Sequence, residues 1–166
     1  MRTISKEELK ELYDRDFPLW AEINYELLKE KLYELVDWEN LLEEIQDMAQ
    51  RHLDACISYL AVILEHLYKW DNFRHLTRGG NEKGGLGWIK SIELARDRLE
   101  ALMDIYPSLR TKVPVSIKEA WRLAIPEIVH SLRELGLKIS KRDIPQECPY
   151  TYEEVMQRDL RKEIKP

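Results

Sequence analysis

One apolar stripe of unusual length constrains this fold more than any other feature of the sequence. Between Trp38 and Trp70, apolar or weakly polar side chains recur every three or four residues, the period of one face of an α-helix. At 1.5 Å per residue, a helix of this length spans about 50 Å. The stripe consists of Leu41, Ile45, Met48, His52, Cys56, Leu60, Leu64 and Leu67.

Other segments of the chain have the same helical period. One stripe covers residues 88–106 and another covers residues 117–135. Capping boxes that begin at Ser5 and Thr151 open short helices near the two ends. No segment alternates apolar and polar side chains between hairpin turns. The sequence therefore predicts an all-α antiparallel helical bundle, with one long helix at about 38–70, two further core helices and short terminal helices.

Prolines mark several expected helix boundaries. Asp16 and Pro18 are residue types preferred at a helix cap and in its first turn, and the helix that they open is expected to end near Leu35. Pro114 and Pro126 are expected to start or kink the helix at 117–135, because proline lacks a backbone donor.

Length and charge indicate one acidic globular domain. The chain has 166 residues, 44% hydrophobic and 34% charged, which is enough for a core without disulfides. We therefore expect a single helical-bundle domain over residues 1–166. Residues 1–106 carry 14 Lys and Arg against 22 Asp and Glu, whereas residues 107–166 carry 12 against 9. Nonspecific nucleic-acid binding requires clustered cations, so this balance argues against such a partner, and the short basic run at 138–142 is a minor exception.

No segment resembles a membrane anchor or a secretion signal. The first residues, MRTISKEELKEL, lack the apolar centre of a signal peptide, and the longest apolar run, residues 59–64, is too short to span a bilayer. Cys56 and Cys148 are the two cysteines of the chain, and such sparse thiols are typical of a reducing compartment. We expect a cytoplasmic protein with no membrane partner.

Five of the six glycines lie within TRGGNEKGGLGWIKSIE, residues 77–93. A P-loop requires GxxxxGK[ST] after a strand, and here no lysine follows Gly84. A dinucleotide-binding turn requires GxGxxG, and here Lys90 occupies the third glycine position. We therefore expect no cofactor and a flexible Gly-rich connection at 77–87, which is either a linker or a lid.

The histidines are the residues that could form the metal site of an enzyme. His52 and Cys56 are four residues apart and could provide two zinc ligands, while His66 is roughly 21 Å further along the same helix. Di-iron bundles need two Glu-x-x-His pairs, whereas the chain has one, at 127–130. No cysteine has a recognisable catalytic histidine partner. A metal site would therefore require His52 or His66 with a glutamate from another helix, and the competing interpretation is a buried structural histidine.

An acidic run provides the clearest candidate interaction surface. The stretch ELVDWENLLEEIQD, residues 34–47, has six acids and no base. Glu39, Glu43 and Asp47 recur every four residues and are expected to project together. They form either a solvated face or a docking patch for a basic partner or a divalent cation. The expected inward face of the same stretch consists of Leu41, Leu42 and Ile45.

Five tryptophans are many for a chain of this length. Most of them are expected to fill the ends of the core. Trp88 lies beside the glycine-rich segment, and exposure there would indicate a contact site.

Several motifs occur in a characteristic order. Residues 13–20 read YDRDFPLW, similar to the pattern YDxDFxxW, and residues 37–48 are similar to DWENLxEEIExM. Residues 66–70 are similar to HLLKW, and the segments 107–109 and 148–151 complete the series. Over about residues 12–160 the chain resembles the bacterial family catalogued as "domain of unknown function 29". The resemblance implies an all-α prokaryotic fold without an established activity.

Ala49 and the glycine-rich segment depart from the family pattern, which weakens any activity assigned to that segment. The positions that match the motifs and merit testing are Glu39, Asn40, Glu43, Glu44, His66 and Trp70.

The sequence as a whole favours a protein-interaction or regulatory module without catalysis, bound to a protein partner or to itself. The expected surface is Glu39, Glu43 and Asp47 together with Trp88. The alternative is a metal-dependent enzyme with ligands from different helices.

Overall fold

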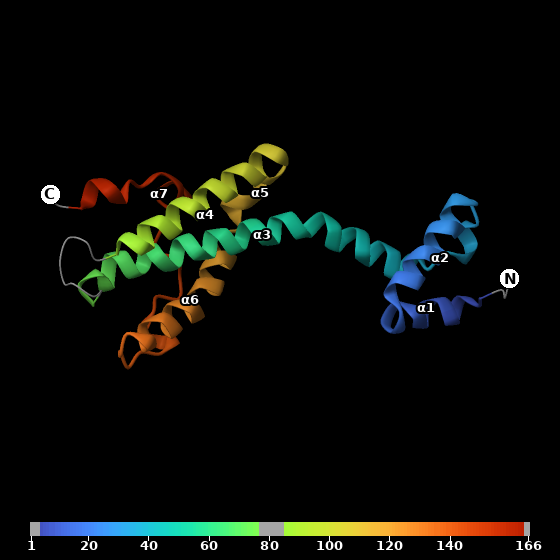
Figure 1. Cartoon of the computed structure of the whole chain (residues 1–166), viewed down its shortest axis with the longest axis horizontal. Helices are drawn as coiled ribbons and strands as arrows, with labels where there is room; N and C mark the ends of the chain where they lie inside the picture. Colours follow the sequence, from blue (N-terminus) through green and yellow to red (C-terminus); the bar gives the residue numbers. More distant parts are fainter. Residues whose placement is uncertain (1–3, 77–84, 165–166) are drawn as a thin grey trace. The chain divides into compact units, whose positions relative to one another are not determined.

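Helices make up all the regular structure of residues 4–76 and 85–164, the parts that this computed structural model describes. No strand occurs in these ranges, which confirms the predicted all-α bundle built on one long helix. In chain order, the α-helices are α1 (Lys6–Arg15), α2 (Phe17–Lys29), α3 (Trp38–Phe73), α4 (Leu86–Ile105), α5 (Leu109–Val115), α6 (Ile117–Glu134) and α7 (Tyr152–Gln157) (Figure 1). Short 3-10 helices are η1 (Tyr33–Leu35), η2 (Arg74–Leu76), η3 (Lys141–Asp143) and η4 (Leu160–Glu163).

The chain divides into two compact units, which we describe separately. The N-terminal unit, residues 1–51, contains α1, α2, η1 and the first part of α3. The C-terminal unit, residues 52–166, contains the rest of α3 and the remaining helices. The single domain expected over residues 1–166 stays a prediction.

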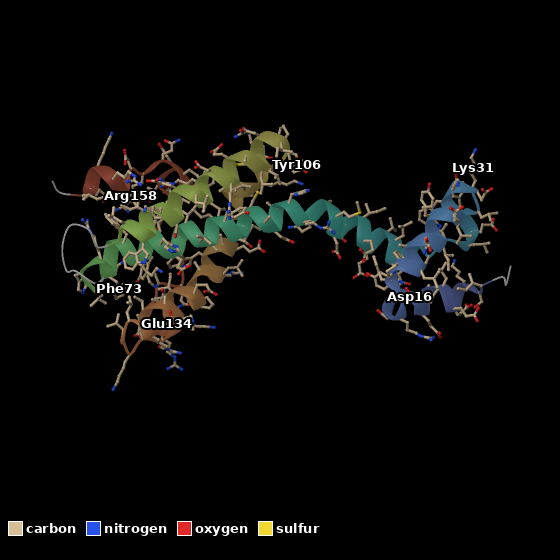
Figure 2. The ribbon with its side chains drawn as sticks, in the orientation of Figure 1. Asp16, Lys31, Phe73, Tyr106, Glu134 and Arg158 are labelled. Atoms are coloured by element: carbon tan, nitrogen blue, oxygen red, sulfur yellow. The ribbon has the colours of Figure 1, made fainter. Side chains whose placement is uncertain are left out.

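Local signals start the helices of the N-terminal unit as expected. Ser5 caps α1 in a complete capping box with Glu8. The Asp16 side chain accepts a hydrogen bond of 3.3 Å from the backbone N–H of Leu19, which caps α2 just before Pro18. α2 and the turn after it lie between Asp16 and Lys31 (Figure 2).

α2 ends earlier than the sequence suggested, at Lys29 instead of near Leu35. Lys31 has a φ of 60°, the left-handed conformation that terminates helices. The N–H of Leu32 donates to the carbonyl of Leu27, and the N–H of Lys31 donates to that of Leu28, which together form a Schellman motif. The prediction failed because lysine, not glycine, occupies the left-handed position.

The core of the C-terminal unit lies among α3, α4 and α6, with α4 running alongside the later part of α3 (Figure 1). Trp121 on α6 is 1% exposed, and its indole N–H donates a 2.9 Å hydrogen bond to the carbonyl of Pro145. Fully buried residues on the three helices include Leu60, Leu64, Leu67, Ile92, Leu99, Ile128 and Leu132.

Two prolines lie inside helices. Pro114 belongs to α5, a separate helix that the sequence did not predict, and Ser116 separates α5 from α6. The expectation that Pro114 would start or kink the helix at 117–135 was therefore wrong. Pro126 lies within α6, where it is exposed.

Most of the expected glycine-rich connection, residues 77–84, lies outside the described residues. Gly85 has a φ of 88° and precedes the first residue of α4. Leu86 and Gly87 already belong to that helix, so these last residues of the expected connection are helical.

Candidate functional site

The acidic residues predicted as a docking patch lie on the first part of α3, in the N-terminal unit. Glu39 accepts a hydrogen bond of 2.9 Å from Lys10 Nζ on α1, although 78% of the Glu39 side chain is exposed. This hydrogen bond and the attraction between the charges raise the pKa of Lys10. Glu43 and Asp47 are exposed. Part of the charge of Glu39 is therefore balanced within the unit.

The expected inward face of this stretch is wrong for two of its three residues, because Leu42 and Ile45 are exposed, whereas Leu41 is partly buried. Leu42 is 59% exposed, Ile45 52% and Met48 61%. Further along α3, Cys56 and Leu60 are fully buried by the core of the C-terminal unit. The apolar stripe of α3 is therefore exposed at Ile45 and Met48 and buried from Cys56 onward.

A buried polar network fixes the start of α3 in the N-terminal unit. Asp37 is fully buried, and its Oδ2 accepts hydrogen bonds from Trp20 Nε1 (2.9 Å) and Asn40 Nδ2 (2.7 Å). Its backbone N–H donates to Asn24 Oδ1 at 2.9 Å. A buried carboxylate is costly without such donors, so these contacts specify how α2 meets α3.

The two N-terminal sequence motifs therefore meet in one unit. Trp20 and Asp37 bond to each other, and Tyr13 on α1 bonds to Glu44 on α3. These two contacts hold the exposed first part of α3 against α1 and α2, which gives a structural reason for the spacing of the two motifs. The sequence analysis did not predict these pairs, because they join helices separated by a turn.

Trp88, predicted as a possible contact, lies in the C-terminal unit and is half-buried against its core. The ammonium of Lys69 is 5.2 Å from the centroid of the Trp88 ring, within cation–π range. In the N-terminal unit, Trp38 is 42% exposed. The role of Trp88 in partner binding stays a prediction.

Lys69 is the centre of a buried charged cluster that the sequence analysis missed. Its side chain is 4% exposed and donates 3.0 Å hydrogen bonds to Glu65 Oε1 and Ser131 Oγ. His66 Nδ1 lies 2.7 Å from the carbonyl oxygen of Val62. Burial, and then the charge of Lys69, lowers the pKa of His66. A lysine inside the apolar run AVILEHLYKW was the available signal.

The cluster is best described as an ion pair between Lys69 and Glu65. Ser131 beside Lys69 has the residue types of a nucleophile and its base. Lys69 Nζ, however, donates hydrogen bonds to both Glu65 Oε1 and Ser131 Oγ, so it does not accept the hydroxyl proton of Ser131 in this arrangement. The arrangement holds an ion pair inside the bundle.

The candidate metal ligands His52 and His66 belong to no group of possible ligands within the described part of the chain. His52 is partly buried and its ring stacks on Tyr106, with the ring centroids 4.2 Å apart. Among residues 4–76 and 85–164, no three His, Cys, Asp or Glu side chains are placed to share a metal ion. Ligand roles for His52 and His66 stay predictions.

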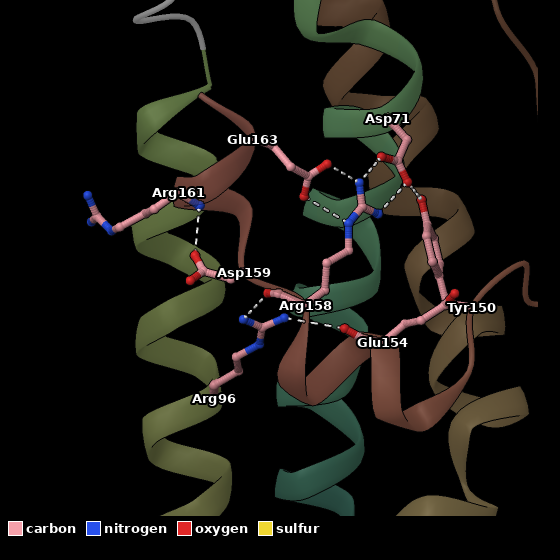
Figure 3. Close-up of polar contacts among 8 residues, drawn as sticks. All are labelled: Asp71, Arg96, Tyr150, Glu154, Arg158, Asp159, Arg161 and Glu163. Atoms are coloured by element: carbon pink, nitrogen blue, oxygen red, sulfur yellow. Dashed lines mark hydrogen bonds and ion pairs between the residues drawn. The ribbon is translucent and has the colours of Figure 1, made fainter. Parts of the chain in front are cut away.

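A second polar cluster attaches the C-terminal segment to α3 (Figure 3). The Arg158 guanidinium donates to both Asp71 oxygens, at 2.8 and 2.6 Å, and to both Glu163 oxygens, at 3.0 and 2.8 Å. These bonds raise the pKa of Arg158. The Tyr150 hydroxyl donates to Asp71 at 2.7 Å, and partial burial followed by this bond raises the pKa of Tyr150.

Arg96 on α4 completes the attachment. Its guanidinium donates to the backbone carbonyls of Arg158 and Glu154 (Figure 3). It also donates to the backbone carbonyl of Val155. Each strong donor in this cluster has an acceptor from another segment, so the cluster fastens α7 and η4 to the bundle.

These features define an all-α helical-bundle protein with an exposed acidic and apolar surface on its N-terminal unit. The chain belongs to the family described as "Domain of unknown function DUF29", whose sequence model matches residues 12–160. This confirms the resemblance inferred from the motifs. No curated protein and no solved structure matched the chain.

None of the helices in the described ranges is both long enough and apolar enough to cross a bilayer.

Proposed function

We propose that this protein is a cytoplasmic protein-interaction module without catalysis, whose N-terminal unit docks a cationic protein partner. The observation that carries this proposal is the first part of α3, where Leu42, Ile45 and Met48 are exposed on the same stretch as Glu43 and Asp47. Apolar anchors bordered by charge are the usual composition of a protein interface. A partner with apolar side chains and a Lys or Arg border complements this surface.

The charge of the N-terminal unit supports a cationic partner. Residues 1–51 carry 7 Lys and Arg against 14 Asp and Glu, a net charge of -7, whereas the whole chain has -5. The remaining residues therefore carry +2. A field of this sign repels nucleic acid and accelerates the encounter with a basic surface.

The distribution of exposed apolar side chains also supports the N-terminal unit. Among the described residues, 10 of the 16 exposed large hydrophobic side chains belong to it. A surface that concentrates apolar side chains in one acidic unit indicates a binding role better than scattered exposure would.

The test is a charge reversal on α3. The variant Glu43→Lys with Asp47→Lys should weaken partner binding by about tenfold or more, with the helical circular dichroism unchanged. Glu39 is left intact because its carboxylate bonds to Lys10. The control is Asp97→Lys with Glu127→Lys, an equal charge change at exposed positions of the C-terminal unit.

Partners captured by the wild-type chain are identified by mass spectrometry, purified, and titrated calorimetrically against the three proteins. The expected partner is a basic protein that the control binds as well as the wild type does. Equal affinity for the α3 variant and the wild type would contradict the proposal. If the captured protein is a second copy of this chain, the proposal of a different, cationic partner is wrong and the chain self-associates instead.

A further inference from the structure

A groove lies between α1 and α2 within the N-terminal unit. It encloses about 1010 Å³ and is lined by side chains from both helices and from the turn that follows α2. The two helices are joined at Asp16, which ends α1 and caps α2 (Figure 2). The volume is at the upper end of the range of about 300–1,000 Å³ found for small-molecule sites, so the groove can accept a row of several side chains.

The floor of the groove is aliphatic. Most of its apolar side chains are partly buried, so they are neither sealed in the core nor fully in water. Ile23 and Leu27 are four residues apart on α2 and therefore lie on one face of that helix. The apolar lining is Ile4, Leu12, Ile23, Leu27 and Leu32.

The borders of the groove are acidic. Glu22 and Glu26 lie four residues apart on α2, Glu30 follows four residues later as the C-cap of that helix, and Glu8 and Glu11 belong to α1. Like charges at this spacing each cost a helix a few tenths of a kcal/mol, so the row has no benefit for α2 itself.

Two basic residues near the borders balance some of this charge. Arg15 also lines the groove, and its guanidinium nitrogen Nη1 lies 3.7 Å from Glu11 Oε2. Lys29 Nζ lies 3.9 Å from Glu26 Oε2. Both pairs are exposed, and exposed pairs of this kind contribute little energy.

The aliphatic floor and acidic borders of the groove favour one class of ligand over the others. A fatty acid or phospholipid would place its anionic head beside the glutamates, and nucleic acid would be repelled for the same reason. An amphipathic α-helix with an apolar stripe and flanking Lys and Arg side chains matches both the floor and the borders. α2 has 13 residues and is about 20 Å long, so the complementary helix has about 14 residues.

We propose that the groove between α1 and α2 binds a cationic amphipathic α-helix of the partner protein. The apolar stripe of that helix contacts the aliphatic floor, and its Lys and Arg side chains pair with the glutamates on both borders. This inference rests on the proposed function and specifies the chemistry of the partner, while the α3 surface contacts other parts of that partner.

The experiment uses a fluorescein-labelled peptide of leucine and lysine, about 14 residues long, with the leucines on one helical face. Its affinity for the whole chain is measured by fluorescence anisotropy. The variant Glu22→Lys with Glu26→Lys should weaken binding by about tenfold or more. The matched control, Asp14→Lys with Glu34→Lys, makes the same charge change at exposed sites outside the groove lining and should stay within about twofold of the wild type. Equal losses in the two variants would overturn the proposal, because they would show attraction to net charge alone.

A second pair of measurements tests the floor. Leu27→Gln should weaken binding of the leucine–lysine peptide, and a serine–lysine peptide of the same charge should not bind the wild-type chain. If the serine–lysine peptide binds as tightly as the leucine–lysine peptide, the groove proposal is wrong. Helical circular dichroism of every variant shows whether the fold is retained, and the border variants test the proposal even if Leu27→Gln unfolds.

The failure of this inference differs from the failure of the proposed function. The Glu43→Lys with Asp47→Lys variant should retain the peptide affinity within about twofold while losing the natural partner. A natural partner that is lost from this variant but unaffected by Glu22→Lys with Glu26→Lys would overturn the groove and leave the proposed function standing. A partner lost only from the groove variant would support the groove and contradict the α3 surface.

Discussion

The phenol of Tyr13 on α1 donates a hydrogen bond of 2.5 Å to the carboxylate of Glu44 on α3. This bond first, and then desolvation and the negative charge of Glu44, raises the pKa of Tyr13 from 10.0 to about 12. The contact joins the first helix of the N-terminal unit to the helix that carries the proposed docking surface. It therefore gives that surface a defined position within its unit.

Replacing Tyr13 with phenylalanine should remove a stabilising contribution that depends on pH. Because the pKa of Tyr13 is higher in the folded than in the unfolded chain, the contribution is complete below pH 10 and is lost as the pH rises toward about 12. The tyrosinate absorbance of the wild type minus that of Tyr13→Phe should titrate with a midpoint near 12. A midpoint near 10 would show that the bond to Glu44 is absent in solution.

Elements with local signals could be predicted from the sequence. Ser5 and Thr151 each form the capping box that their neighbours indicated, because these contacts span three residues. The long helix ends at Phe73, close to the expected Trp70. Lys31 was missed because nothing in its residue type signals a left-handed conformation.

Features that depend on tertiary contacts could not be predicted. Ile45 and Leu60 belong to one apolar stripe, yet Ile45 is 52% exposed and Leu60 fully buried. Periodicity identifies a face of a helix but does not say which part of that face has a partner. The groove was missed for the same reason, because its lining comes from two helices with separate patterns.

Arg158 should contribute to stability through Asp71 and Glu163. Replacing it with methionine removes charge-assisted hydrogen bonds and should cost about 2 kcal/mol at neutral pH. The control is Arg161→Met, whose pair with Glu93 is more exposed and should cost much less. Urea unfolding measures both, and equal losses would contradict the role assigned to Arg158.

The contribution of the Arg158 cluster to the unfolding free energy should depend on pH, because Asp71 titrates in the acid range. Partial burial opposes the shift, but the bonds from Arg158 and Tyr150 lower the pKa of Asp71 below 3.8. Its contribution is therefore present above pH 3.8 and is lost as the pH falls through its lower folded value. In Arg158→Met, the loss of unfolding free energy over this acid range should be smaller than in the wild type. A loss of the same size in the two proteins would contradict the prediction.

The buried pair of Lys69 and Glu65 should show strong coupling. Lys69→Met leaves Glu65 without its cation and should cost about 3 kcal/mol, whereas Lys69→Met with Glu65→Leu should recover most of that loss. In Lys69→Met the pKa of His66 should rise, because a repelling charge has gone and Glu65 remains. Denaturant unfolding and proton NMR of the histidine check the two results, and additive costs with an unchanged pKa would contradict them.

Two glycines at the start of α4 should respond oppositely to alanine. Gly85 has a φ of 88°, and a Cβ there would lie 2.8 Å from the Trp70 ring, so Gly85→Ala should cost about 1–2 kcal/mol or more. Gly87 is helical, with nothing within 4 Å of an added Cβ, so Gly87→Ala should stabilise by about 0.5–1 kcal/mol. Thermal unfolding distinguishes the two, and a stabilised Gly85→Ala would contradict the turn geometry.

Hydrogen–deuterium exchange of the whole chain, with and without the purified partner, tests the central claim most directly. Docking on the N-terminal unit predicts that binding slows amide exchange in α1, α2 and the first part of α3. Protection confined to residues 52–166, with no change in these helices, would contradict the account.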